Sequence, residues 1–447
     1  MGAPEECNDE GICGGAVYVY SYDGPTFSNG GSLAGPTPQG PTTPTVGLAP
    51  TPAPTPTFMP TTSAMPTFSF GWQQVNGVFD SVDQELFAAA VSLSGDGNIL
   101  FVGAFENSEY APEAGRIVRV DLQNGNSASV FYGTAYDFLG FDVSSDNEGS
   151  RVAGYLSSSS LLEVADYTAS NGLQQTSQLA TGFNSTSATF SLSADGNWLV
   201  GIGVVDTEDG STGPLTVKTF QLSDTSGSFE PFGQDLVLEA FDIAPTLDIH
   251  LLEDGSFMAF SIAGWNGYVG RVRTYRRTDT GWQKIGSDLT SDRNSDFYGK
   301  TIRLSRAANN LILLFIGAPY RNQVLVYQIM ANGVEWEPYG SPITASEDFG
   351  EQDEFGFDID TSHDGSRVVV GIRCYDACRG AAQVFEYVNQ DWAALGQIIA
   401  GYADSYFGEA VDCDGDCNII AIGAPEDCGD SGCGGSVYVF QGIDNRT

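Results

Sequence analysis

A unit of about fifty residues recurs along this chain and limits its possible folds more than any other feature. Each copy has an alternating strand, a turn rich in Asp and Gly, an apolar strand, Gly-rich backbone and a strand of Val-x-Val-aromatic type, as in residues 404–440. Seven copies, 47 to 59 residues apart, are marked by Val91, Val143, Phe190, Ile249, Ile302, Ile359 and Val411. Strands and turns at this period predict an all-β fold, a seven-bladed β-propeller.

The fourth strand of a copy carries an aromatic residue four positions before a glycine. This pattern is found at Phe229–Gly233, Trp282–Gly286, Trp336–Gly340 and Trp392–Gly396. A similar segment, Trp72–Gly77, precedes the first copy, whereas the last copy ends after three strands at Phe440. Pairing of Trp72–Gly77 with Ser436–Phe440 completes the last blade and removes two open sheet edges. We therefore predict a propeller over residues 68–442, closed by an N-terminal outer strand.

The motifs of the last three copies resemble FG-GAP repeats, which form the propeller head of integrin α chains. The matching residues are Tyr298-Gly299 with Gly317-Ala318-Pro319, Phe355-Gly356 with Gly371, and Phe407-Gly408 with Gly423-Ala424-Pro425. Earlier copies match less well, and copy four has Phe260-Ser261 where a glycine is expected. The resemblance covers most of residues 72–441 and implies a propeller that binds ligands or mediates adhesion.

The same resemblance implies calcium loops, with oxygen ligands at alternate positions after the first strand. Calcium needs six to eight oxygen ligands, several of them charged. Only the last copy has three carboxylates at these positions, Asp412, Asp414 and Asp416, and its later position holds Ile420 instead of an acid. In most copies Asp-Gly simply makes a hairpin turn. The sequence leaves calcium open at this one loop and predicts no other cofactor.

Three further segments lie outside the repeats. Residues 2–20 nearly duplicate residues 423–440, so residues 1–24 are interpreted as an orphan half-repeat, the remnant of a preceding propeller in a longer chain. Residues 25–67 form a linker, and ten Pro and ten Thr occur within residues 36–67. This composition predicts a disordered, extended segment that can carry O-linked sugars. Residues 443–447 are expected to form a short tail.

The eight cysteines fall into four close pairs: Cys7 with Cys13, Cys374 with Cys378, Cys413 with Cys417, and Cys428 with Cys433. Each pair is self-contained, which favours four short-loop disulfides over a zinc site; free thiols are the alternative. Disulfides imply an oxidising compartment. Glycosylation sequons at Asn184 and Asn445 agree with an extracellular or cell-surface glycoprotein, although no signal peptide is visible.

The charge of the chain restricts its partners. With 57 acidic and 18 basic residues, the net charge is −39. Such a surface repels nucleic acid and anionic membranes, and it suits a cation-rich medium or cationic partners. The alternative is that the charge only keeps a β protein soluble. The longest apolar run, Leu311 to Ala318, is a strand, so no membrane insertion is expected.

The sequence shows no recognisable catalytic motif. The two histidines, His250 and His363, have no nucleophile motif near them, and Ser157–Ser160 is interpreted as a loop or strand end. We therefore expect that the chain is not an enzyme. A carboxylate-based hydrolase, or its accessory propeller, remains an alternative, and it would show a deep central pocket with carboxylates of raised pKa.

The resulting hypothesis is a non-catalytic, extracellular propeller that binds a protein or glycan partner and is monomeric within a longer chain. The candidate binding loops are Glu106–Glu113, Asp206–Thr212 and Ser346–Glu354, and Trp265 is the candidate ligand contact. This rests on analogy of fold, which is a weak guide to function. The other alternative is an acidic structural protein of a cell wall or matrix that gathers cations.

Overall fold

A computed structural model gives the fold of the chain, and it divides into two units, residues 1–43 and 44–447. The structure describes residues 6–7, 13–14, 70–81, 85–123, 127–183, 188–205, 213–238, 246–330, 333–344, 350, 352–428 and 433–444. In the first unit, strand β1 (Glu6–Cys7) pairs with β2 (Cys13–Gly14) in antiparallel register. The expected Pro/Thr linker and both sequons, Asn184 and Asn445, lie outside the described residues.

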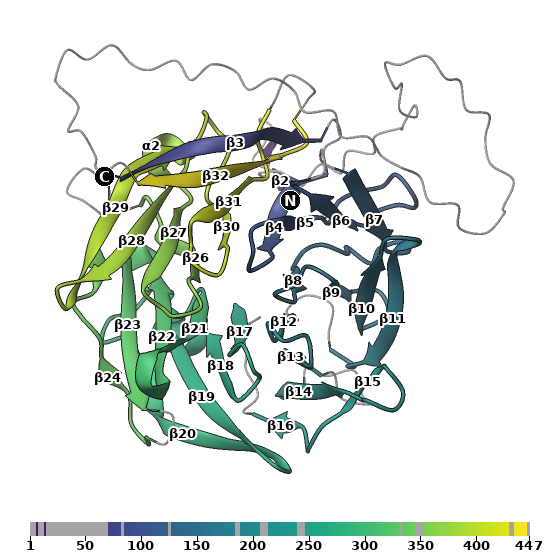
Figure 1. The fold of residues 1–447 in the computed structure, drawn as a ribbon, viewed down its shortest axis with the longest axis horizontal. Coiled ribbons are helices and arrows are strands. Elements are labelled where there is room, and N and C mark those ends of the chain that lie inside the picture. The colour runs from purple at the N-terminus through teal and green to yellow at the C-terminus, as the bar shows by residue number, and fades with distance from the viewer. Residues whose placement is uncertain are drawn as a thin grey trace, which may run out of the picture. The chain divides into compact units, whose positions relative to one another are not determined.

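The second unit is a ring of seven antiparallel sheets whose innermost strands surround its centre (Figure 1). The innermost-to-outermost strands of blades 1 to 3 are β4 (Phe87–Leu93), β5 (Ile99–Ala104), β6 (Arg116–Asp121), β7 (Ser127–Tyr132); β8 (Ser144–Ser145), β9 (Arg151–Leu156), β10 (Leu161–Thr168), β11 (Gly172–Ala180); β12 (Thr189–Leu192), β13 (Trp198–Val204), β14 (Leu215–Leu222), and β15 (Phe229–Pro231) with β16 (Leu236–Val237). All seven residues that mark the repeats lie in, or directly before, an innermost strand. The predicted seven-bladed, all-β architecture is therefore confirmed.

Blades 4 to 7 follow the same plan. Their strands are β17 (Leu247–Leu251), β18 (Phe257–Ile262), β19 (Arg271–Thr278), β20 (Gly281–Thr290); β21 (Ile302–Ala307), β22 (Leu311–Ala318), β23 (Gln323–Met330), β24 (Glu337–Pro338) with β25 (Ile343–Thr344); β26 (Phe355–Thr361), β27 (Arg367–Ile372), β28 (Ala381–Val388), β29 (Asp391–Ala400); and β30 (Ala410–Cys413), β31 (Ile419–Ala424), β32 (Ser436–Asp444), β3 (Phe70–Asp80). Short helical turns are α1 (Trp265–Tyr268), α2 (Tyr375–Cys378), η1 (Ala308–Asn310) and η2 (Pro319–Arg321). No helix among the described residues has the length and apolar character needed to span a membrane.

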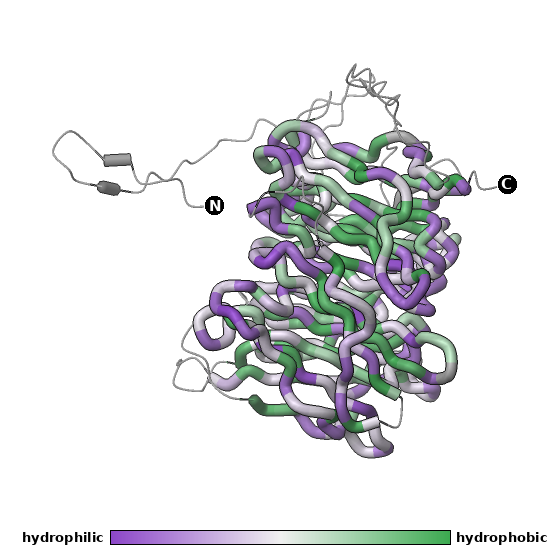
Figure 2. Tube along the Cα trace, turned by 90° about the vertical axis from the view of Figure 1, so that its left-hand side faces the viewer, coloured by the Kyte–Doolittle hydropathy of each residue, from purple (hydrophilic) through white to green (hydrophobic). Residues whose placement is uncertain are grey.

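The hydrophobic core lies between neighbouring blades. The second strands β5, β13 and β18 are buried along their whole length, as their unbroken apolar sequences predict. One cluster, for example, packs Val91 and Val102 of blade 1 against Ala421 and Val437 of blade 7. Figure 2 shows these apolar strands beside more polar connecting segments. Each blade therefore depends on both of its neighbours for burial.

The N-terminal strand closes the ring. Strand β3 pairs with β32 in antiparallel register, and Gln74 lies opposite Phe440 while Val78 lies opposite Tyr438. The indole N–H of Trp72 donates to the Leu395 carbonyl oxygen of blade 6 at 3.0 Å. The indoles of Trp282, Trp336 and Trp392 contact the preceding blade in the same way. The predicted closure and the predicted packing role of these tryptophans are confirmed.

Close contacts between glycines explain the repeated Gly motifs. A Cβ at Gly371 in β27 would lie 2.1 Å from the carbonyl oxygen of Gly408 in the next blade. A Cβ at Gly103 in β5 would lie 2.0 Å from the Gly140 oxygen. In copy four the expected glycine is Ser261, whose hydroxyl donates to the Gly299 oxygen at 2.6 Å. These positions remain small because neighbouring backbones touch there.

Removal of β3 tests the closure. We expect a chain lacking residues 1–80 to unfold at lower temperature and to self-associate, because β32 then presents an unpaired edge and Trp72 no longer covers blade 6. A chain lacking only residues 1–67 keeps β3 and serves as the control. Thermal unfolding and size-exclusion chromatography measure both effects. Identical behaviour of the two chains would show that β3 does not close the ring.

Candidate functional site

The channel opens differently on the two faces of the ring. Each blade is an antiparallel meander, so successive connections alternate between the two faces of the ring. The connections from first to second strand and from third to fourth strand lie on what we call the turn face. The connections from second to third strand and from one blade to the next lie on the opposite face, which we call the loop face. Toward the loop face the channel widens into a chamber of about 380 Å³, the loop-side chamber. A smaller chamber of about 170 Å³, the turn-side chamber, lies toward the turns. Arg303 lines both chambers.

One side chain from each innermost strand faces the channel, and together these form a belt: Ser92, Ser144, Ser191, His250, Arg303, Asp360 and Asp412. Six of them accept a hydrogen bond from the innermost strand of the next blade. The backbone N–H donors are Ser145 to Ser92, Leu192 to Ser144, Leu251 to Ser191, Leu304 to His250, Cys413 to Asp360 and Leu93 to Asp412, at 2.9 to 3.2 Å. The belt therefore satisfies N–H groups at the free inner edges of the blades.

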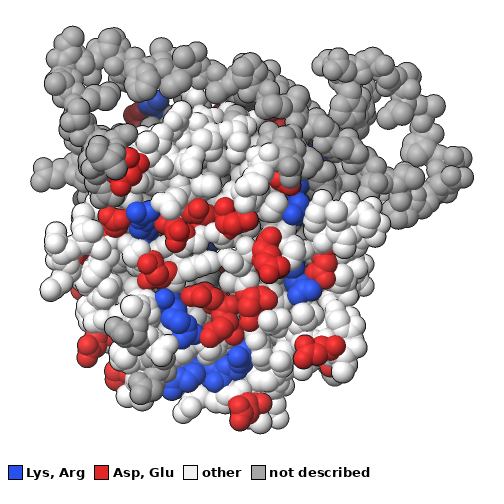
Figure 3. Space-filling view, in the orientation of Figure 1, with Lys and Arg blue, Asp and Glu red and all other residues white. Residues whose placement is uncertain are grey.

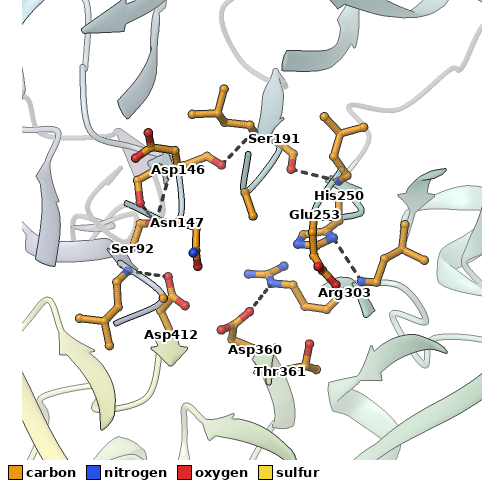
Figure 4. Close-up of a pocket in the computed structure, with 18 of the residues that line it drawn as sticks. Ser92, Asp146, Asn147, Ser191, His250, Glu253, Arg303, Asp360, Thr361 and Asp412 are labelled. Atoms are coloured by element: carbon orange, nitrogen blue, oxygen red, sulfur yellow. Dashed lines mark hydrogen bonds and ion pairs between the residues drawn. The ribbon is translucent and has the colours of Figure 1, made fainter. Parts of the chain in front are cut away.

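Arg303 is the exception in the belt because guanidinium has no acceptor. Its side chain reaches into the channel, where its Nε donates to Asp360 at 3.2 Å (Figure 4). Its remaining nitrogens lie 3.4 Å from the Asp248 carboxylate and 3.6 Å from the Asp358 carboxylate. One cation is thus shared among three carboxylates of blades 4 and 6.

The surroundings of these groups shift their pKa values. Burial raises the pKa of Asp248 to about 6, although Arg303 acts in the opposite direction. Burial also raises the pKa of Asp142 and Asp358. The pKa of Asp412 is raised well above its ordinary range by burial and by the neighbouring Asp360 carboxylate. The channel therefore contains carboxyl groups that hold protons more tightly than carboxyls in water.

The pKa values of the two basic groups of the channel, Arg303 and His250, are shifted in opposite directions. Burial opposes the Arg303 cation, but Asp358, Asp248 and Asp360 outweigh burial and raise its pKa. Burial and Arg303 lower the pKa of His250 well below its ordinary value, so its ring is neutral. Because Nδ1 of His250 accepts from Leu304, its proton is assigned to Nε2. Acidic side chains also gather around the centre of the face seen in Figure 3.

The turn face is nearly closed by the backbone. Gly95 donates its N–H to the Asn147 oxygen at 2.9 Å, and Gly415 donates to the Gly95 oxygen at 2.9 Å. Similar bonds link His363 to Gly415 and Asn147 to Ala194. A Cβ at Gly95 would lie 1.7 Å from Oδ1 of Asn147, so the turn tips are in contact. The wide, accessible end of the channel is therefore the loop face.

The three carboxylates considered as calcium ligands are not brought together. Asp412 belongs to the belt and accepts from the N–H groups of Leu93 and Cys413 at 2.9 and 2.7 Å. Asp414 caps its own turn by accepting from Ile419 at 3.1 Å, and Asp416 is exposed. Among the residues that the structure describes, no three His, Cys, Asp or Glu side chains are placed to hold a metal. The three carboxylates are therefore not arranged as a set of calcium ligands. Whether this loop binds calcium stays a prediction.

Charged and aromatic side chains form one wall of the loop-side chamber. The Lys300 ammonium lies 4.3 Å from the centre of the Phe357 ring. The Arg373 guanidinium lies 4.9 Å from the same ring and 4.4 Å from the Tyr406 ring. Arg373 is paired with Glu409 at 3.1 Å and with Glu354 at 3.4 Å. These contacts hold Lys300 in the wall of the chamber and Arg373 next to Phe357 and Glu409, which line it.

Exposed aromatic side chains mark the loop face. Among the described residues, the strongly exposed aromatic side chains are Tyr110, Tyr136, Phe141, Tyr320 and Tyr402, with 41 to 72% of their surface accessible. All five lie in connections of the loop face. Phe141 also lines the loop-side chamber. The loops of Tyr110 and Tyr136 lie side by side, since the Tyr136 N–H donates to the Pro112 oxygen at 2.8 Å.

The other predicted candidates have separate positions. Trp265 lies in α1 on the loop face, half-buried, with the Arg271 guanidinium 3.8 Å from the centre of its ring. As a ligand contact it stays a prediction. Of the candidate loops, Glu106–Glu113 is described, Asp206–Thr212 lies outside the described residues, and Ser346–Glu354 is described only at 350 and 352–354.

Three of the four predicted disulfides are present: Cys374 with Cys378, Cys413 with Cys417, and Cys428 with Cys433. The side chains of Cys7 and Cys13 lie outside the described ones. Each of the three bonds closes a short loop of the propeller. They indicate an oxidising compartment.

The sequence analysis missed most of the residues that line the loop-side chamber. Asp142, Asp248 and Asp358 come directly before a residue that marks a repeat, and Arg303 directly follows one. These positions alternate with buried ones on the innermost strand and therefore face the channel. Polar residues directly before or after the marker residue were a usable signal. Lys300 follows the Tyr298-Gly299 motif and Phe141 lies in a connection, and neither position is polar in every copy.

Comparisons with known proteins place the fold but not the family. No protein-family pattern and no curated protein matches the sequence. Among solved structures, the Cps50 (Swd1) β-propeller domain of Myceliophteria thermophila matches with a TM-score of 0.52 and 11% identity, covering 81% of this chain and 98% of that one. An oligogalacturonate lyase in complex with manganese matches with a TM-score of 0.51 and 13% identity, covering 84% and 96%. The propeller is confirmed; membership in the FG-GAP family is not shown.

One expectation from the sequence is corrected here. The prediction that the chain is not an enzyme is contradicted, because solved propellers with this fold include enzymes. One is the oligogalacturonate lyase. Another is the hydrazine synthase of Kuenenia stuttgartiensis, which matches with a TM-score of 0.50 and 10% identity, covering 79% of this chain and 95% of that one. Absence of a sequence motif did not exclude chemistry, because channel residues come from separate blades and are distant in sequence.

The raised pKa of Asp248 predicts a pH-dependent stability. The pKa of Asp248 is about 6 in the fold and 3.8 ordinarily, so protonated Asp248 stabilises the fold. This contribution to the free energy of unfolding is complete below about pH 4 and is lost as the pH rises through 6. We expect Asp248→Asn to remove on the order of 2–3 kcal/mol of the difference in unfolding free energy between pH 4 and 7.5. Urea unfolding measures this, with Asp235→Asn as the control at an exposed carboxylate paired with Lys218. An unchanged pH dependence in Asp248→Asn would contradict the assignment.

Proposed function

We propose that this propeller is an extracellular binding protein that takes a glycan at its loop face and seats part of it in the loop-side chamber. One observation carries this proposal. Among the described residues, the strongly exposed aromatic side chains all lie on the loop face, where the channel is wide. Contiguous exposed aromatic surface is typical of interaction sites. The disulfides agree with an extracellular location.

The chemistry of this face suits a sugar. A sugar ring has apolar C–H faces and a polar rim, so it packs against aromatic rings while its hydroxyls bond to polar groups. Phe141, 65% exposed, offers a ring at the edge of the chamber. Asp142, Asp358 and Thr301 line the wall behind it. A chamber of about 380 Å³ is within the size range of small-molecule sites.

Binding to a glycan array tests the proposal. We expect the intact protein to bind a subset of glycans, and Phe141→Ala or Tyr136→Ala to weaken binding roughly ten- to thirtyfold, as for an aromatic hot spot. Val334→Ala is the matched control, since Val334 is 71% exposed but lies between β23 and β24 on the turn face. Absence of any bound glycan, or equal loss in the control, would refute the proposal.

A second function, acid-base cleavage of the bound glycan, is favoured by the buried carboxyls. With a pKa of about 6, Asp248 is protonated often enough near neutral pH to act as a general acid. Asp358 and Asp142, whose pKa values burial also raises, line the same chamber. Glycosidases use a pair of carboxyl groups in this way, one to protonate the leaving oxygen and one as base or nucleophile.

Release of new reducing ends from the glycans that bind is the measurement for this second function. We expect the rate to fall as the pH rises above 6, since the protonated fraction of Asp248 falls, and to drop at least about 100-fold in Asp248→Asn while glycan binding persists. Binding without any product between pH 4 and 8 would exclude cleavage and leave the binding function intact.

A further inference from the structure

The charged groups of the loop-side chamber are almost all engaged with one another. Asp142 accepts from the Thr189 hydroxyl at 2.7 Å, and Asp248 accepts from the Ile302 N–H at 2.7 Å. Asp358 accepts from the Val411 N–H at 2.9 Å, and Glu409 is paired with Arg373. Arg303 is shared by Asp248, Asp358 and Asp360. These groups have their partners before any ligand enters.

Lys300 differs from these groups. It lines the chamber and is half-buried, and within the described part of the chain its side-chain ammonium forms neither an ion pair nor a hydrogen bond. The Phe357 ring lies 4.3 Å from the ammonium. The charge of Lys300 also acts on the Asp358 carboxylate and opposes the rise of its pKa, but the two groups do not form an ion pair. An ammonium carries three N–H donors, and an aromatic face satisfies none of them fully. The other two lysines of the chain, Lys218 and Lys284, each form an ion pair with an aspartate.

We infer that Lys300 binds a carboxylate of the ligand, so that the chamber takes an acidic sugar, a uronic acid, in preference to its neutral counterpart. This inference rests on the proposed glycan-binding function and names the group that anchors the glycan. A carboxylate at Lys300 forms a charge-assisted hydrogen bond without displacing an internal partner. The apolar C–H face of the same sugar is left to pack on Phe141, and its hydroxyls are left to face the polar wall.

The acidic wall does not reverse this preference. A cationic ligand would have to compete with Arg303, Arg373 and the backbone N–H groups for carboxylates that already accept hydrogen bonds. An anionic ligand meets one group whose donors are available. Long-range repulsion from the net charge of −39 is screened within about 8 Å at physiological ionic strength, so contacts inside the chamber decide the preference.

The test uses the intact protein and two sugars that differ only at C6, D-glucuronate and D-glucose. Ligand-observed NMR titration gives both dissociation constants. We expect glucuronate to bind at least about tenfold more tightly than glucose, and Lys300→Gln to abolish this difference while glucose binding stays unchanged. Lys300→Arg keeps the cation and is expected to retain most of the preference.

Lys284→Gln is the matched control. Lys284 lies in the outer strand β20 and is paired with Asp288 at 2.5 Å, so its loss should leave the preference for glucuronate intact. Equal affinity for the two sugars, or a preference that survives in Lys300→Gln, would overturn the inference and leave the proposed glycan binding standing. If neither sugar nor any glycan of the array binds, both proposals fall.

Discussion

Every blade of this ring has an inner edge that no further strand covers, and the backbone N–H groups along these edges require acceptors. The belt supplies acceptors for most of them: six of its seven side chains accept from the next blade, and Arg303 is the exception. The acceptors are side chains of residues that the innermost strand points into the channel, so the requirement is satisfied only when all seven blades are in place. The belt therefore links the integrity of the ring to the composition of its channel.

The chemistry of the channel follows from this structural requirement. Blades 1 to 3 use serine as the acceptor, whereas blades 6 and 7 use Asp360 and Asp412. Carboxylates consequently accumulate on one side of the channel, and Arg303 of blade 5 offsets part of their charge. Burial then raises the pKa of Asp412 and of Asp248, which also lines the channel. The carboxyl groups of raised pKa in the channel are therefore also residues that hold the blades together.

The fold could be predicted from sequence because its signals are local and repeated. The alternating strands, the Asp-Gly turns and the surplus strand at Trp72 fixed the number of blades and the partner of β32. The site could not be predicted in the same way. Asp412, Asp414 and Asp416 have the spacing of calcium ligands, but a carboxylate that accepts backbone N–H groups occupies the same positions. For Asp412 the donor Leu93 belongs to another blade and is distant in sequence, whereas Asp414 accepts within its own turn.

The pairing of β3 with β32 also has a consequence for biosynthesis. The first strand of the propeller leaves the ribosome long before the strand that it must join, and at ~5–20 residues per second this interval lasts tens of seconds. Throughout it, the apolar side of Trp72 and the open edge of β3 have no partner. Closure of the ring is thus the last step that the order of synthesis allows, because β3 waits for β32.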